Sequence, residues 1–173
     1  MKQLRGTPLK RFLRSLPPPP KPTELVIVCQ SVAYPVNVGS VFRIADALDA
    51  AEVVLTGITP TPPHPKIIKV GRGKDRRIPW RYVERPESAL EALRKEGYWL
   101  VALEITDSCQ PYYAVDYPGR VALVLGNEDH GVTRASLAMC DAAIFVPMYG
   151  KGKSLNVHVS LAVVGYYLLH RLS

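Results

Sequence analysis

The chain has 173 residues, a hydrophobic share of 47% and a formal net charge of +7, which together indicate one globular domain suited to a polyanionic partner. The longest apolar-rich stretch, residues 155–169, is interrupted by polar residues and is too short for a membrane span, and the N-terminus lacks the apolar core of a secretory signal, so the expected compartment is the cytoplasm. Three scattered cysteines without a C-x-x-C pair and four histidines without zinc-site spacing lead us to expect neither a disulfide framework nor a metal site.

The first 22 residues differ in composition from the rest of the chain. They contain six basic residues and no acidic one, with weak helical periodicity over residues 1–16 and four consecutive prolines at 17–20. Consecutive prolines cannot continue a helix and favour an extended segment. We therefore predict a basic N-terminal arm over residues 1–22, followed by one domain over residues 23–173.

From Glu24 onward, segments typical of strands alternate with segments typical of helices. Strands are predicted over 25–29, 52–58, 80–83, 98–105, 121–125 and 142–146, and helices over 38–48, 87–96, 133–139 and about 154–171. Loops are predicted for the proline-rich residues 60–65 and for 110–118. This alternation predicts an α/β fold with a mostly parallel sheet and helices on both of its faces.

A second basic segment lies between two of the predicted strands. Residues 66–85 contain eight basic and two acidic residues, so each basic segment carries +6 and the remainder of the chain sums to −5. Either segment alone is equally compatible with solvated surface charge. Two focused basic segments on a slightly acidic body favour a nucleic acid as partner.

Several common nucleotide and hydrolase motifs are missing from the sequence. There is no G-x-G-x-x-G after the first predicted strand, no G-x-x-x-x-G-K-[ST] loop and no G-x-S-x-G elbow. Dinucleotide-binding, nucleoside-triphosphate-binding and hydrolase functions therefore lose their usual support.

Polar residues instead follow three of the predicted strands, at the sheet edge where open α/β folds bind ligands. Asn37 to Arg43 begins a predicted helix, where free N–H groups and an arginine suit a phosphate, although a capped helix with a surface arginine is the plainer interpretation. Gly126 permits a close backbone approach to a ligand, and Glu128 is alternatively a cap for the next helix.

The third segment, Ser154-Leu155-Asn156-Val157, follows a loop of Gly150 to Lys153 and opens the last predicted helix. Ser154 is a candidate helix cap as well as a candidate site residue. Asn156 needs a polar partner, because it is expected inside the first turn of an otherwise apolar helix.

Together these segments resemble the motif set of the SpoU/TrmH family of RNA 2′-O-ribose methyltransferases, in the SPOUT superfamily. The family pattern N-x-G-x-[ILVF]-x-R matches residues 37–43, and G-x-E-x-x-G matches 126–131. I-P-M, a glycine-containing loop and S-L-N-V match 146–157, with valine in place of the first isoleucine. One departure is Asp129-His130, where the family often has a small residue. The resemblance covers residues 24–172.

This resemblance implies a homodimeric enzyme whose C-terminal trefoil knot holds S-adenosylmethionine, with the domain over 23–173 as the methyltransferase domain. Arg43 would be the principal catalytic residue, binding the target phosphate and helping to deprotonate the ribose 2′-hydroxyl, in its own or the partner's site. The other implied catalytic residues are Asn37, Glu128, Ser154 and Asn156. The residues implied to line the cofactor are Leu103, Gly126, Val146, Met148 and Leu155.

The substrate follows less directly from the sequence. Residues 154–160 most resemble the branch that methylates guanosine in the tRNA D-loop, so tRNA is the expected substrate and rRNA the alternative. A non-catalytic RNA-binding factor with the same fold is a second hypothesis, but a decayed site would have lost some of the five implied catalytic residues. An unrelated nucleotide-binding α/β protein would leave both basic segments unexplained.

Overall fold

The computed structural model describes residues 1, 3–17 and 23–170. The elements in chain order are α1 (Gly6–Arg14), β1 (Glu24–Gln30), α2 (Pro35–Leu48), β2 (Glu52–Thr56), α3 (Pro65–Gly71), the 3-10 turn η1 (Lys74–Arg76), β3 (Trp80–Val83), α4 (Pro86–Lys95), β4 (Trp99–Leu103), β5 (Gln110–Pro111), η2 (Tyr112–Ala114), β6 (Arg120–Leu125), α5 (Arg134–Met139), β7 (Ala142–Phe145) and α6 (Val157–His170). Most of the predicted polyproline segment, Lys2 and Lys21 of the predicted arm, and the predicted helix end at 171 lie outside the described residues.

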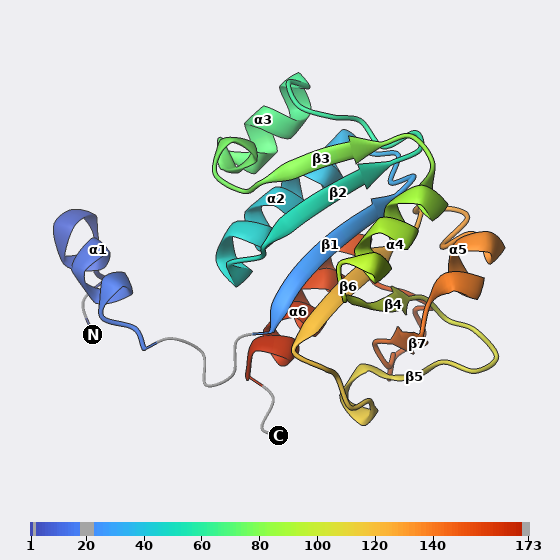
Figure 1. Cartoon of the computed structure of the whole chain (residues 1–173). Helices are drawn as coiled ribbons and strands as arrows, with labels where there is room; N and C mark the ends of the chain where they lie inside the picture. Colours follow the sequence, from blue (N-terminus) through green and yellow to red (C-terminus); the bar gives the residue numbers. More distant parts are fainter. Residues whose placement is uncertain (2, 18–22, 171–173) are drawn as a thin grey trace.

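The strands form one seven-stranded sheet in the order β3-β2-β1-β6-β4-β7-β5 (Figure 1). All pairings in the sheet are parallel. The predicted α/β fold with a mostly parallel sheet is therefore confirmed. Because the strands are parallel, their carboxyl ends lie at one edge, and the loops that carry the three polar segments meet there.

Alternate residues of each central strand enter two separate cores. On β1, Leu25 and Ile27 pack with residues of α2, α3 and α6, whereas Val26 and Val28 pack with residues of α4. Parallel sheets need such cover on both faces, and their strands are accordingly apolar throughout. Helices thus cover both faces of the sheet, as the sequence predicted (Figure 1).

The structure differs from the sequence prediction at several elements, among them α2, α3 and β5. α2 begins at Pro35, three residues before its predicted start, because proline is well suited to the first turn of a helix. Pro65 likewise opens α3, a helix that the proline-rich sequence concealed. The two-residue strand β5 lies within the predicted loop 110–118, where a segment of that length leaves no periodic signal.

The N-terminal helix α1 contributes nothing to either core. None of its residues is buried, and Leu9, Phe12 and Leu13 on it are exposed. In Figure 1 it stands apart from the sheet. Within the described part of the chain, no helix combines the length and apolar character needed to cross a bilayer.

Candidate active site

A cavity of about 630 Å³ opens at the carboxyl edge of the sheet, a size typical of small-molecule sites. It is bounded by the loops that follow β1, β4, β6 and β7 and by the start of α6. Its lining includes most of the predicted site residues, namely Asn37, Leu103, Gly126, Glu128, Val146, Ser154, Leu155 and Asn156. The fold thus brings the three polar segments around one cavity.

Glu128 connects the loop after β6 to the loop after β1. One oxygen of its carboxylate, Oε2, accepts the backbone N–H of Ala33 at 2.8 Å. The other, Oε1, accepts the N–H of Tyr34 at 3.2 Å and the amide Nδ2 of Asn37 at 2.6 Å. The interpretation of Glu128 as a cap for the following helix is wrong, because Thr133 caps α5 by accepting the N–H of Ser136. Glu128 instead satisfies donors at the start of α2.

Asn37 extends this connection to α6. Its side chain is buried, and its Oδ1 lies 3.1 Å from Nδ1 of His158. Asn37 and His158 are 121 residues apart in the sequence. Burial lowers the pKa of His158 below its ordinary range, so its imidazole is favoured in the neutral form.

The turn after β6 is held in one conformation by Asn127. Its Nδ2 donates to the carbonyl of Ser31 at 2.8 Å, and its Oδ1 accepts the N–H groups of Asp129 at 2.9 Å and His130 at 3.0 Å. Its backbone also exchanges hydrogen bonds with Gly131. This wall of the cavity is therefore held in place by hydrogen bonds within the chain itself.

Gly126 is required by the geometry of its own loop. A Cβ at this position would collide with the backbone of Gly131 and Val132, so the absent side chain allows the turn to close on itself. Gly126 also lines the cavity, and its predicted close approach to a ligand stays a prediction.

Two residues that contribute to the site were not singled out from the sequence. Glu104 follows β4 and lines the cavity, and its Oε2 accepts the N–H of Val132 at 2.8 Å. His158 belongs to the four histidines that the sequence analysis assigned to no site, but its Nδ1 lies 3.1 Å from Oδ1 of Asn37. Glu104 directly follows β4, but the sequence prediction extended that strand to residue 105 and so placed Glu104 inside it. No signal in the sequence marks His158.

The segment before α6 lies at the mouth of the cavity. Ser154, Leu155 and Asn156 are all exposed, and α6 begins only at Val157. Asn156 is the residue at the cap position, because its Oδ1 accepts the N–H of His158 at 3.3 Å and its carbonyl accepts the N–H of Ser160 at 3.0 Å. Ser154 lies too early to cap this helix, and its side chain is exposed at the cavity.

Arg43 and Met148 are not among the residues that line the cavity. Arg43 is exposed on α2, six residues and about 9 Å of helix beyond Asn37. Met148 is half-buried in the loop after β7, with its Cε near Gly152. The structure therefore leaves the predicted roles of these two residues untested.

Charges around the cavity are unequally distributed. The lining contains the acidic residues Glu104, Glu128 and Asp129, against one basic side chain, Lys153. Apolar side chains from three different loops, Leu103, Val146 and Leu155, complete the lining. An acidic cavity with an apolar wall suits a ligand that carries positive charge beside an apolar group better than it suits a phosphate.

Basic residues lie outside the cavity, on the face formed by α2 and α3. Lys74 and Arg77 pair with Asp46 at 2.5 and 3.4 Å, so part of the basic segment is neutralised within the fold. The exposed cations there that do not pair with Asp46 are Lys66, Lys69, Arg72 and Arg76. α3 packs on α2 at Gly39, so these cations lie on the same face as the helix that carries Arg43.

Comparisons with known proteins agree with this geometry. The sequence profile described as the SpoU rRNA Methylase family matches residues 24–166. The 23S rRNA (guanosine-2'-O-)-methyltransferase RlmB of Ralstonia nicotianae is 31% identical over 139 residues, which cover 80% of this chain and 55% of that protein. The tRNA (guanosine(18)-2'-O)-methyltransferase of Thermus thermophilus is 28% identical over 141 residues, which cover 82% of this chain and 72% of that protein.

Among solved structures, the AdoMet-bound rRNA methyltransferase from Sinorhizobium meliloti superposes with a TM-score of 0.79 at 25% identity, over 86% of this chain and 57% of that one. The chain thus spans a little more than half the length of several of the relatives that it matches.

Proposed function

The chain belongs to the SpoU rRNA Methylase family, and on that premise we propose that it is an S-adenosylmethionine-dependent RNA 2′-O-ribose methyltransferase. The observation that carries the proposal is the convergence of the three polar segments on one acidic, partly apolar cavity at the carboxyl edge of the sheet. A cationic sulfonium attached to an apolar adenosine moiety matches that lining in both charge and polarity.

The chain's own residues have distinct roles in this proposal. Leu103, Val146 and Leu155 provide apolar contacts for the cofactor, and Met148 extends them from the neighbouring loop. When bound, S-adenosylmethionine supplies the methyl group that the ribose 2′-oxygen accepts as its proton leaves. Ser154 and Asn156, exposed at the cavity mouth, position the ribose and phosphate.

We assign the activation of the ribose hydroxyl to Arg43. No ion pair or hydrogen bond within the described residues engages its guanidinium, so its full donor capacity remains available to an RNA phosphate. A phosphate held beside the 2′-hydroxyl would favour loss of its proton by electrostatics and proximity, without a covalent enzyme intermediate. The buried Cys29 is also poorly suited to act as a nucleophile, because burial raises the pKa of its thiol to about 12 and so disfavours the reactive thiolate.

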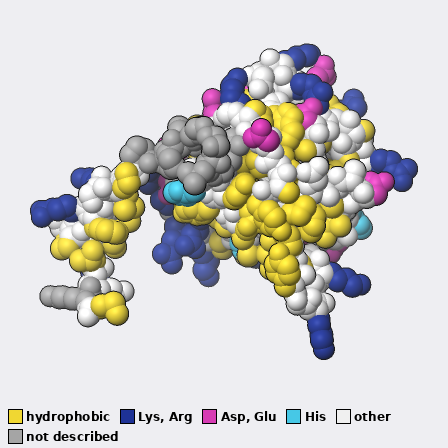
Figure 2. Space-filling view, turned by 90° about the horizontal axis from the view of Figure 1, so that it is seen from below, with side chains coloured by type: hydrophobic (Ala, Val, Ile, Leu, Met, Phe, Trp, Pro, Cys, Tyr) yellow, Lys and Arg dark blue, Asp and Glu magenta, His cyan; other side chains and the backbone are white. Residues whose placement is uncertain are grey.

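Arg43 and the cavity are separate within one chain, which is consistent with a dimer in which a site borrows an arginine from its partner. A second copy would also cover the outer surface of α6, where Val159 and Tyr166 are exposed although the helix is apolar around its circumference. Figure 2 shows hydrophobic side chains gathered on the underside of the domain. We therefore propose that the protein is a homodimer and that its C-terminal segments form a trefoil knot of the family type.

The exposed cations Lys66, Lys69, Arg72 and Arg76 form the proposed RNA contact on the catalytic domain, residues 23–173. The arm of residues 1–22 adds a second contact, because Lys10, Arg11 and Arg14 are exposed on α1. Deletion of residues 1–16 should weaken RNA affinity and flatten its dependence on salt, since each neutralised phosphate contributes to the slope. A filter-binding series in increasing salt measures this, and an unchanged slope would remove the arm from the interface.

For the substrate we propose tRNA, with guanosine in the D-loop as the first target to test. The match to the T. thermophilus tRNA enzyme supports this choice, because it covers 72% of that protein, compared with 55% of R. nicotianae RlmB. The similarity to rRNA enzymes supports rRNA as the second candidate. Either substrate implies a cytoplasmic protein.

The deciding experiment is methyl transfer from labelled S-adenosylmethionine to unmodified tRNA and rRNA transcripts, followed by mapping of the modified nucleotide. A 2′-O-methyl product on tRNA would establish the reaction and the substrate together. Label only on rRNA would retain the reaction and change the substrate. If the protein bound no cofactor, the proposal would fail in favour of a non-catalytic RNA-binding factor.

A further inference from the structure

The contact between His158 and Asn37 joins two of the three segments that surround the cavity, and Glu128 joins the third. This series of hydrogen bonds runs from Glu128 in the loop after β6, through Asn37 on α2, to His158 in the first turn of α6. Two of its members, Asn37 and Glu128, line the cavity, whereas His158 is outside the lining and directly follows the lining residues 153–157 in the sequence.

Hydrogen-bond chemistry fixes the orientation of every group in this series. An ionised carboxylate only accepts, so the Asn37 atom that faces Glu128 at 2.6 Å is its donor, Nδ2. The Oδ1 of Asn37 therefore faces His158, and only a protonated Nδ1 can donate to it. A neutral His158 must then carry its proton on Nδ1 and leave Nε2 unprotonated.

We infer that His158 is a positioning residue, whose Nδ1–H holds the Asn37 amide toward Glu128 and fixes the start of α6 against α2. The inference rests on the proposed function insofar as the fixed segment forms the cofactor cavity. The backbone N–H of His158 donates to Oδ1 of Asn156. His158 therefore contacts α2 through its side chain and the cap of α6 through its backbone. Residues 153–156, exposed at the cavity mouth, gain a fixed attachment point at 158.

The tautomer provides a direct test that requires neither cofactor nor RNA. In protein labelled with 15N-histidine, two-dimensional NMR spectra above pH 7 should show Nδ1 of His158 as protonated and Nε2 as unprotonated. Free histidine in water favours the opposite tautomer, so this pattern would not arise by default. A proton on Nε2 of His158 would overturn the inference.

Three substitutions distinguish the effect of the Nδ1 hydrogen bond from the effect of having a side chain of similar size at position 158. In H158N the amide nitrogen takes the position of Nδ1 and preserves the donor, whereas H158Q places its nitrogen near the position of Nε2 and H158A has neither. Lys95→Ala serves as the control, because Lys95 is exposed on α4, the helix on the other face of the sheet, and does not line the cavity.

The functional readout is the affinity for S-adenosylmethionine, measured by titration calorimetry. H158A and H158Q should weaken binding about tenfold, and H158N should remain within about twofold of the unaltered protein, as the loss or retention of one hydrogen bond predicts. Equal affinities in H158A and H158N would overturn the positioning role, whether both were weakened or both were unchanged.

Failure of the proposed function would be recognised separately from failure of this inference. If the unaltered protein bound no S-adenosylmethionine, the proposed function would fail, and hydrogen exchange over residues 153–160 would then decide the positioning role. Faster exchange in H158A and H158Q than in H158N and K95A would support the inference. Equal exchange in all four variants would refute it.

Discussion

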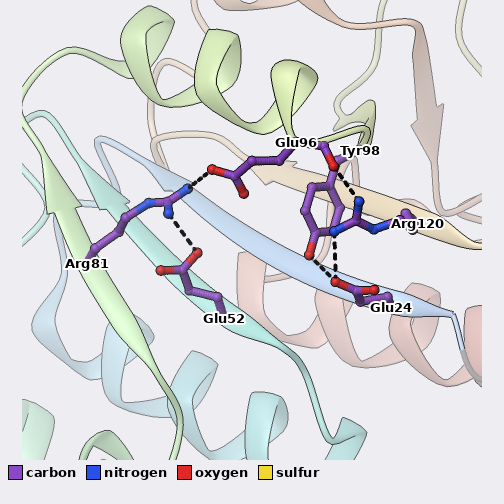
Figure 3. Close-up of polar contacts among 6 residues, drawn as sticks. All are labelled: Glu24, Glu52, Arg81, Glu96, Tyr98 and Arg120. Carbon is purple, nitrogen blue, oxygen red and sulfur yellow. Dashed lines mark hydrogen bonds and ion pairs between the residues drawn. The ribbon is translucent and has the colours of Figure 1, made fainter.

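The two edges of the sheet use charged residues in opposite ways. At the amino edge, acids and bases pair with each other: Arg120 lies 3.1 Å from Glu24 and stacks over the ring of Tyr98 at 4.3 Å (Figure 3). Arg81 similarly contacts both Glu52 and Glu96 at 3.4 Å. At the carboxyl edge, Glu104 and Glu128 accept hydrogen bonds from backbone N–H groups and an amide, and within the described residues neither carboxylate forms an ion pair.

This difference indicates that charged residues stabilise the fold at the amino edge and shape the ligand site at the carboxyl edge. Ion pairs at the amino edge are largely solvent-exposed, where such pairs contribute little free energy each. The carboxylate oxygens at the carboxyl edge accept hydrogen bonds from neutral donors instead of pairing with cations. An edge of that kind retains an acidic field for a ligand, whereas the amino edge has neutralised its own field.

The sharpest contrast is between two arginines. Arg43→Ala should reduce methyl transfer about a thousandfold, as removal of a preorganised electrostatic group does, while leaving cofactor affinity and thermal stability unchanged. Arg120→Ala, at the amino edge, should lower the melting temperature slightly and leave turnover intact. Single-turnover kinetics and thermal melts of both variants measure the contrast, and normal turnover in R43A would remove Arg43 from catalysis.

The next largest effect is expected at Glu128. Glu128→Gln replaces one accepting oxygen with a donor that faces existing donors, so about 2 kcal/mol of stability and about 100-fold in cofactor affinity should be lost. Glu24→Gln is the matched substitution at the amino edge, where water can replace the lost contacts. Urea unfolding and calorimetry compare the pair, and equal stability losses would contradict the distinction between the edges.

The hydroxyl of Tyr98 provides a smaller test of the amino edge alone. Tyr98→Phe removes the donor to Glu24 and keeps the buried ring, so stability should fall by about 1 kcal/mol without any change in methyl transfer. Urea unfolding with activity assays at matched folded fractions checks this. A loss of turnover in the folded variant would show that the two edges are coupled.

The two edges should also respond to different ranges of pH. Burial lowers the pKa of His158 from 6.5, so the folded state binds fewer protons and stability should fall as pH decreases below about 6.5. Hydrogen bonds from Tyr98 and Arg120 lower the pKa of Glu24 from 4.5, so its contribution is present above about 4.5 and is lost only at lower pH. Unfolding measured from pH 7 to 3 should lose the first response in H158N and the second in E24Q, and an unaltered profile in either variant would contradict its assignment.

The sequence by itself determined the α/β class, the position of nearly every strand and the segments that reach the carboxyl edge. Apolar runs such as Val121 to Leu125 are bounded by turn residues, and this local signal survives without knowledge of the fold. The pattern also placed Asn37, Glu128 and Asn156 in segments that follow predicted parallel strands, and the carboxyl ends of parallel strands lie at one edge of the sheet. The pattern did not reveal β5, which is too short to leave a periodic signal, or α3, because its opening Pro65 belongs to a proline-rich segment typical of a loop.

Only the tertiary structure decided how the gathered residues engage one another. It assigned Glu128 to the donors at the start of α2, placed His158 beside Asn37 and left Arg43 outside the cavity. The physical reason is that strand and helix patterns depend on neighbours within a few residues. A hydrogen bond between residues 121 positions apart depends instead on how α2 and α6 pack against the same face of the sheet.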